Sequence, residues 1–100
     1  MTTNQQIAQT ILDQLGGNRF AAMTGAKNFV AIENGITMKL GRSASGITHM
    51  TVTLDASDTY TVRFQRVHGV KVTEKGTTEG VYAEMLRDIF ESATGMFTSL

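Results

Sequence analysis

The chain has 100 residues and no cysteine, and its nine Lys and Arg balance nine Asp and Glu to a formal charge of zero. This length suits one domain with a single core, and the missing cysteines exclude disulfides, thiolate metal sites and cysteine nucleophiles. No apolar run reaches the ~18 residues of a membrane span, and the N-terminus lacks the pattern of a secretory signal. We therefore expect a cytoplasmic protein that does not bind membranes and does not coat nucleic acid by net charge alone.

The first part of the chain predicts two helices. Thr3 and Gln6 have the spacing of a capping box, and apolar residues then recur at helical spacing, which predicts a helix over residues 4–15. Two glycines follow and are expected to end it. Asn18 is a candidate cap for a second, short helix that ends at Gly25.

The segment "FVAIENGITMKL", residues 29–40, predicts a β-hairpin. Its apolar residues alternate with period two, and Asn34-Gly35 is a strong signal for a two-residue turn. A turn at these positions pairs Glu33 with Ile36 and fixes the register of both strands. The apolar residues that this register places on one face are Phe29, Ala31, Ile36, Met38 and Leu40.

Three further strands are expected after this hairpin. The segment "GRSASG", residues 41–46, indicates a loop, and the alternating residues 50–54 and 60–65 predict two strands joined by a turn at "DASD". Gly69 suggests a bulge or a tight bend before a short fifth strand around residues 70–72. Together with the hairpin, these segments form an antiparallel meander.

A final helix is expected to follow directly. Lys75-Gly76 closes the predicted sheet, and Thr77 or Thr78 then caps a helix that ends at Gly95. No internal repeat or linker is visible, so residues 1–100 predict one α+β domain: an antiparallel sheet of about four to five strands flanked by an N-terminal and a C-terminal helix. The helical stripe expected to cover the sheet is Val81, Tyr82, Met85, Leu86, Ile89, Phe90 and Ala93.

The glycine-rich stretch "GGNRFAAMTGAKNFV", residues 16–30, resembles a phosphate-binding loop only superficially. It follows a helix and lacks the spacing of both the P-loop and the dinucleotide-binding pattern. We interpret it as a corner between elements, with anion binding by Arg19 and Lys27 as the alternative.

No catalytic or metal-binding constellation stands out. His49 and His68 have no second ligand at helical spacing, and no serine lies in a nucleophile motif. Asp55 and Asp58 suit a turn better than an acid/base pair, because aspartate side chains bond to nearby backbone N–H groups in turns. The sequence therefore predicts a protein that is not an enzyme and has no cofactor.

Two surfaces are candidates for binding a partner. The apolar tail Met96, Phe97 and Leu100 either folds back on the core or forms a contact with a partner or a second copy, and an exposed edge strand is another candidate dimer contact. The second surface is a set of cations that could neutralise phosphates, although the neighbouring Phe64 is expected to face the core. The cations of this nucleic-acid hypothesis are Arg42, Arg63, Arg66, Lys71 and Lys75, together with Arg19 and Lys27 of the corner.

Three segments carry a resemblance to a known group of proteins. "LGGNRFAAMTGAKNF", "SDTY" and "VYAEMLRDIFESATGMFTSL" are together similar to a family of small uncharacterised proteins encoded in bacteriophage and prophage genomes, whereas residues 41–50 contribute little. The resemblance implies a product made in the cytoplasm of a bacterial host, and it assigns no site residues.

The leading hypothesis from the sequence is thus a small noncatalytic accessory protein of phage type. It would bind a host or phage protein, for instance to inhibit a host defence complex, through the tail and the Arg19/Lys27 corner. The alternative is an accessory factor that binds nucleic acid.

Overall fold

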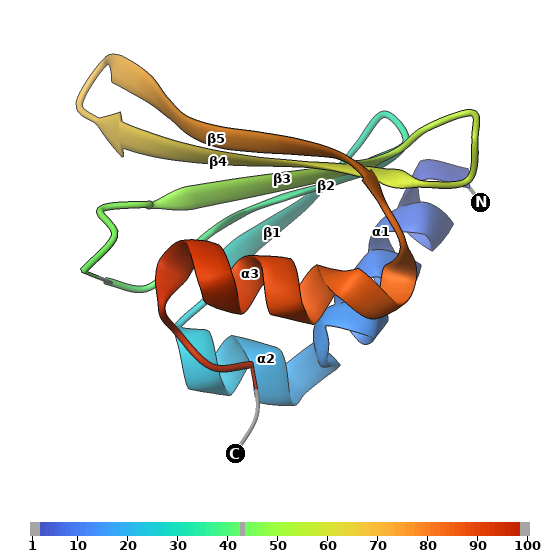
Figure 1. Ribbon diagram of the computed structural model, residues 1–100, viewed down its shortest axis with the longest axis horizontal. Coiled ribbons are helices and arrows are strands. Elements are labelled where there is room, and N and C mark those ends of the chain that lie inside the picture. Colours follow the sequence, from blue (N-terminus) through green and yellow to red (C-terminus); the bar gives the residue numbers. More distant parts are fainter. Residues whose placement is uncertain (1–2, 43, 99–100) are drawn as a thin grey trace.

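The structure, a computed structural model, describes residues 3–42 and 44–98. In this part of the chain three α-helices lie on one face of a five-stranded antiparallel sheet, and the strands follow chain order from β1 to β5 (Figure 1). The α+β fold expected from the sequence is therefore confirmed. None of the described helices is long and apolar enough to cross a membrane. The elements are α1 (Thr3–Leu15), α2 (Gly17–Thr24), β1 (Lys27–Ile32), β2 (Gly35–Lys39), β3 (His49–Leu54), β4 (Tyr60–His68), β5 (Lys71–Val81), the 3₁₀ turn η1 (Ala83–Met85) and α3 (Leu86–Thr94).

The two N-terminal helices are separated by a single residue. α2 begins at Gly17, and its N-cap is Gly16, which has a φ of 125° and provides no side-chain bond. The expectation that Asn18 caps α2 was therefore wrong. Gly16 can adopt a backbone conformation closed to other residues, so the chain turns before it reaches the asparagine.

The hairpin between β1 and β2 has a different register from the expected one. Ala31 pairs with Ile36, so the two turn residues are Glu33 and Asn34, and Gly35 belongs to β2. The predicted pair of Glu33 with Ile36 was wrong. The register differs by two residues, which leaves every side chain on its expected face. On that face Ile36, Met38 and Leu40 are buried, whereas Phe29 and Ala31 are exposed.

The fifth strand is much longer than expected. β5 pairs with β4 from Lys71 to Val81, so Thr77 and Thr78 are strand residues and do not cap a helix. The final helix begins only at Leu86, after η1. β5 mixes Val and Thr, which favour strands, with Lys, Glu and Gly, which do not, and the long strand β4 offers it backbone hydrogen-bond partners along its whole length. The bend expected at Gly69 is the two-residue turn between the two strands.

The core lies between the sheet and the helices. α1 packs on β1 and β2, and the rings of Phe20 in α2 and Phe90 in α3 meet edge to face with centroids 5.1 Å apart. Phe64 is buried with the core face of β4, as expected. The largest side chains without solvent exposure are Phe20, Phe90, Ile11, Leu15, Met38, Met50, Leu86, Val52, Val62 and Val81.

α2 and α3 end with the same local sequence, F-x-x-x-T-G. The Thr24 hydroxyl donates to the Phe20 carbonyl (2.7 Å) and accepts the N–H of Ala26 (3.3 Å). Thr94 makes the same two bonds, at 2.8 and 3.1 Å, to the residues four before and two after it. A left-handed glycine follows each threonine. The two helices therefore end with the same capping arrangement.

Candidate functional site

The meander gathers most of the basic residues at one end of the sheet. In an antiparallel meander the end of one strand lies beside the start of the next, so the ends of β2 and β4 meet the starts of β3 and β5. The cationic surface, as we call it, consists of Arg42, Arg66, Lys71 and Lys75, while Lys39 lies at the same end with its side chain on the other face of the sheet, beside His49. The other end of the sheet carries carboxylates on its turns, namely Glu33, Asp55 and Asp58, with Glu79 near the end of β5.

The cationic surface is hollowed on both sides of Arg66. A hollow of about 380 Å³ lies between β4 and the loop that follows β2, and Lys39 and Arg42 line it together with Arg66. A second hollow of about 270 Å³ is lined by Arg66, Lys71 and Lys75 with His68 and Thr73. No carboxylate lines either hollow among the described residues. This is the arrangement expected of a surface that holds anions.

Arg66 is free to meet a ligand. Arg66 is exposed, and a Cβ added at Gly46 would lie 3.6 Å from its Nη1 atom, so the guanidinium group lies close to the loop that follows β2. Within the described ranges no carboxylate pairs with Arg66 or with the other cations of this surface. Burial and, secondarily, the charge of Lys39 lower the pKa of His49 below its ordinary value. The His49 ring is therefore neutral at pH 7 and adds no charge here.

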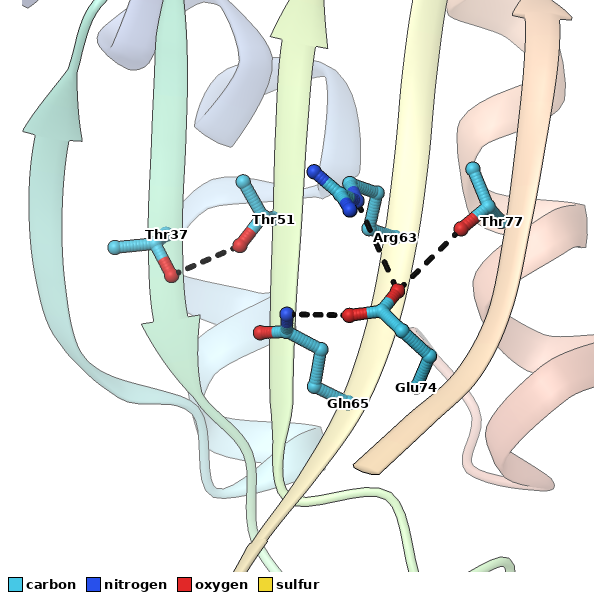
Figure 2. A network of polar contacts seen from close by, with 6 residues as sticks. All are labelled: Thr37, Thr51, Arg63, Gln65, Glu74 and Thr77. Carbon is cyan, nitrogen blue, oxygen red and sulfur yellow. Dashed lines mark hydrogen bonds and ion pairs between the residues drawn. The ribbon is translucent and has the colours of Figure 1, made fainter. Parts of the chain in front are cut away.

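Arg63 lies apart from this surface, on the face of the sheet that the described helices leave open. Its Nε atom is 3.8 Å from Oε1 of Glu74, and the same carboxylate accepts bonds from Gln65 (2.7 Å) and Thr77 (3.5 Å), as Figure 2 shows. Thr37 and Thr51 share a hydroxyl bond of 3.1 Å on this face. The structure thus separates Arg63 from Arg66, which the sequence placed in one group.

An apolar groove borders the cationic surface. It has a volume of about 420 Å³ and lies between β5 and α3, where Gly76 contributes no side chain. Ile47 and Phe64 form its apolar floor, and Lys75 belongs to both the groove and the second hollow. The groove and the second hollow are therefore neighbours that share Lys75, and Asp88 of α3 also lines the groove.

The other predicted binding residues are dispersed. Arg19 in α2 and Lys27 at the start of β1 are both exposed, but no described contact joins them. In the tail, Met96 packs against the core, while Phe97 is 67% exposed. Leu100 lies outside the described residues.

A polar clamp holds the tail in place. The N–H and hydroxyl groups of Thr98 both donate to Oε2 of Glu91 at 2.9 Å, and Nε of Arg87 donates to the Thr98 hydroxyl at 3.1 Å. Thr98 is 1% exposed, so the clamp buries it and leaves the preceding Phe97 outside. The bonds from Thr98, the backbone bond first, lower the pKa of Glu91.

The remaining candidates behave as turn or surface residues. The carboxylate of Asp55 accepts a bond from Thr61 (2.7 Å), and Asp58 has a φ of 64° in the turn between β3 and β4. No cluster of three or more metal-ligating side chains occurs within residues 3–42 and 44–98. Comparison with protein-family models, with curated proteins and with solved structures gave no match.

Sequence reasoning overlooked Lys39 as a residue that lines the first hollow. Lys39 ends the second strand of the first hairpin, some twenty-seven positions before Arg66 in the numbering of the chain. Its place beside Arg66 depends on the order of the strands. A meander assumed from the start would have provided that signal, because it brings the end of β2 and the end of β4 to the same end of the sheet.

Proposed function

We propose that this protein is a noncatalytic binding protein that holds the phosphate backbone of nucleic acid on its cationic surface. The observation that carries the proposal is the position of Arg66 between two adjoining hollows without a carboxylate in either lining. Arginine and lysine side chains that contact phosphates supply most of the affinity of such complexes. We therefore favour nucleic-acid binding, the second hypothesis from the sequence, over binding of a protein partner.

Zero net charge is no obstacle to this function. The molecule measures 34 × 33 × 25 Å, and the two ends of its sheet carry opposite charge. Electrostatic interactions in water are screened over about 8 Å at physiological salt, so a ligand at one end is little affected by the other. Nucleic acid at the cationic surface thus meets the local charge of this surface.

The test compares two arginines three residues apart on β4. Arg66→Gln removes a cation from the cationic surface, while Arg63→Gln removes one from the opposite face, where it is already paired with Glu74. We expect Arg66→Gln to weaken binding of a labelled oligonucleotide about tenfold, as loss of a charged hydrogen bond of about 1.5 kcal/mol would. Fluorescence anisotropy measures both affinities. Equal losses in the two variants would contradict the proposed surface.

Salt dependence provides a second, independent readout. Affinity should fall steeply between about 50 and 200 mM salt, because each phosphate contact releases bound counterions. In Arg66→Gln the slope of log affinity against log salt should be smaller by about 1. Arg63→Gln should keep the slope of the parent protein. Binding that does not respond to salt would argue against phosphate contacts.

The clamped tail favours a protein partner as the second candidate function. A large aromatic ring at Phe97 is held outside the molecule by the bonds between Thr98 and Glu91, and exposed aromatic side chains are frequent anchors of interfaces. Phe97→Ser should then abolish capture of a protein partner from nuclease-treated bacterial lysate, whereas Arg66→Gln should retain it. The reverse pattern would indicate that the tail has no part in binding. The resemblance to phage and prophage proteins suggests a bacterial cytoplasm as the setting for either function.

A further inference from the structure

The hairpin of β4 and β5 extends beyond the rest of the sheet. β3 begins at His49, which pairs with Gln65, so residues 66–68 of β4 pair only with residues 71–73 of β5. Figure 1 shows this hairpin projecting past β3. The three pairs span about 10 Å at about 3.4 Å per residue. At the cationic end the two strands therefore continue as a two-stranded ribbon beyond the ladder of β3, and the Thr48 hydroxyl still bonds to Val67 at the base of this ribbon.

The ribbon has two different faces. Successive side chains of a strand point to opposite sides, and Arg66, His68 and Lys71 all line the second hollow. Val67 pairs with Val72 on the opposite face, which has no charged side chain within the ribbon. The donors of the hairpin are thus gathered on the side that faces the cationic surface.

Thr48 fixes the base of the ribbon. Its backbone N–H donates to the carbonyl of Gln65 at 2.9 Å, and its hydroxyl accepts the N–H of Val67 at 2.8 Å. These bonds satisfy the edge of β4 just before β3 begins. The ribbon therefore leaves the sheet in a defined direction, with Arg42 and Lys75 beside its base.

The geometry points to duplex DNA as the ligand, with the ribbon of residues 66–73 in its major groove, given that the protein binds nucleic acid as proposed above. The major groove of B-DNA is about 12 Å wide and about 8.5 Å deep, and it accepts a two-stranded ribbon. Arg66 and Lys71 then face base edges, where guanine offers two acceptors, while Arg42 and Lys75 contact phosphates on either side.

Single strands and RNA duplexes fit this surface less well. Proteins that bind single strands stack bases on exposed aromatic rings, but within the described part of the chain no Phe, Tyr or Trp lines either hollow, and the ring present there is the imidazole of His68. Phe64, the nearest aromatic along β4, is only 3% exposed. The major groove of an RNA duplex is too narrow for a ribbon. Charge without stacking thus favours the DNA duplex.

The ligand experiment compares oligonucleotides of equal length and sequence by fluorescence anisotropy. We expect the DNA duplex to bind at least about tenfold more tightly than the single strand or the RNA duplex. Methylation of guanine N7, which lies in the major groove, should weaken binding, whereas a ligand that fills the minor groove should not. Equal affinity for single strands, or indifference to N7 methylation, would overturn the groove assignment and leave nucleic-acid binding intact. Absence of binding to all three would overturn both proposals.

Two exposed positions of the ribbon provide the variants. Lys71→Gln changes the donor face, and Val72→Thr makes a change of similar size on the opposite face, where Val72 is 57% exposed. We expect Lys71→Gln to weaken duplex binding about tenfold and Val72→Thr to leave it unchanged. Circular dichroism confirms that both variants fold. A larger loss in Val72→Thr than in Lys71→Gln would contradict the assigned face.

Discussion

Gly35 was predicted to be a turn residue, but in the structure glycine is required there for a different reason. Asn34-Gly35 correctly indicated a hairpin, but the positive φ in the turn, 58°, belongs to Asn34. Gly35 lies in β2, and a Cβ there would come within 2.1 Å of the carbonyl oxygen of Val52 and 2.9 Å of the Cα of Thr53. Glycine is therefore required at position 35 by the close approach of β3. The two glycine requirements cannot be told apart in the sequence, because both are met by the same residue.

Substitution of Gly35 by alanine tests this at the residue scale. Gly35→Ala should lower the free energy of unfolding by about 1–3 kcal/mol, because the added methyl group forces two strands apart. Gly76→Ala is the matched control, since nothing lies within 4 Å of the Cβ it adds. The control should change stability by less than about 0.5 kcal/mol. Urea denaturation measures both, and similar losses would refute the steric argument.

At the scale of elements, local signals predicted the features that depend on residues close in sequence. They failed for the features that depend on contacts between segments far apart in sequence. The ends of α2 and α3 were foreseeable, because the T-G pair that ends each helix acts within a few residues. The repeated F-x-x-x-T-G motif was equally visible in the sequence and could have been found there. The length of β5 was not foreseeable, because its hydrogen bonds go to β4. The segment with threonine and glutamate that was expected to begin the final helix instead belongs to β5.

The clamp after α3 predicts a pH dependence. The pKa of Glu91 is lowered in the folded protein by the backbone and hydroxyl bonds from Thr98. A depressed carboxyl pKa contributes stability that is present above its unfolded value, about 4.3, and is lost as the pH falls through the folded pKa. We expect the free energy of unfolding of the parent protein to decrease over this acidic range.

Two variants separate the contributions of this clamp. Glu91→Gln should remove the pH dependence that arises from this carboxylate, which chemical denaturation at several acidic pH values measures. Thr98→Val keeps the backbone bond, the larger cause of the shift, and should reduce the dependence only in part. If Glu91→Gln retains the full slope, the clamp does not stabilise the folded state in this way.

At the scale of the whole molecule, charge is segregated although the total is zero. The turns at one end of the sheet carry Glu33, Asp55 and Asp58, and the other end carries the cationic surface. Net charge counts residues and ignores their positions, whereas a ligand responds to the charges within about a Debye length. The exclusion of nucleic-acid binding by charge alone, drawn from the composition, therefore applies to uniform coating and not to a local surface.

Retention on an anionic resin tests this segregation. We expect the protein to bind a sulfonate or heparin resin at pH 7 despite its zero formal charge. The double variant Arg66→Gln, Lys71→Gln should elute at clearly lower salt. The control, Arg19→Gln with Arg63→Gln, loses the same charge from other surfaces and should elute close to the parent protein. Identical elution of the two variants would show that total charge alone governs retention.

The sequence by itself determined the class of fold, the positions of most elements and the faces of the first hairpin, because periodicity, turn residues and helix ends are local properties. It also placed Phe64 in the core and named Arg42, Arg66, Lys71 and Lys75, which line the two hollows, as candidate cations. Only the tertiary structure decided that Lys39 lies at the same end of the sheet, that Arg63 faces away and pairs with Glu74, and that β5 continues to Val81. The physical reason is that strand pairing between distant segments fixes these features, and its hydrogen bonds are made by backbone groups that every residue possesses.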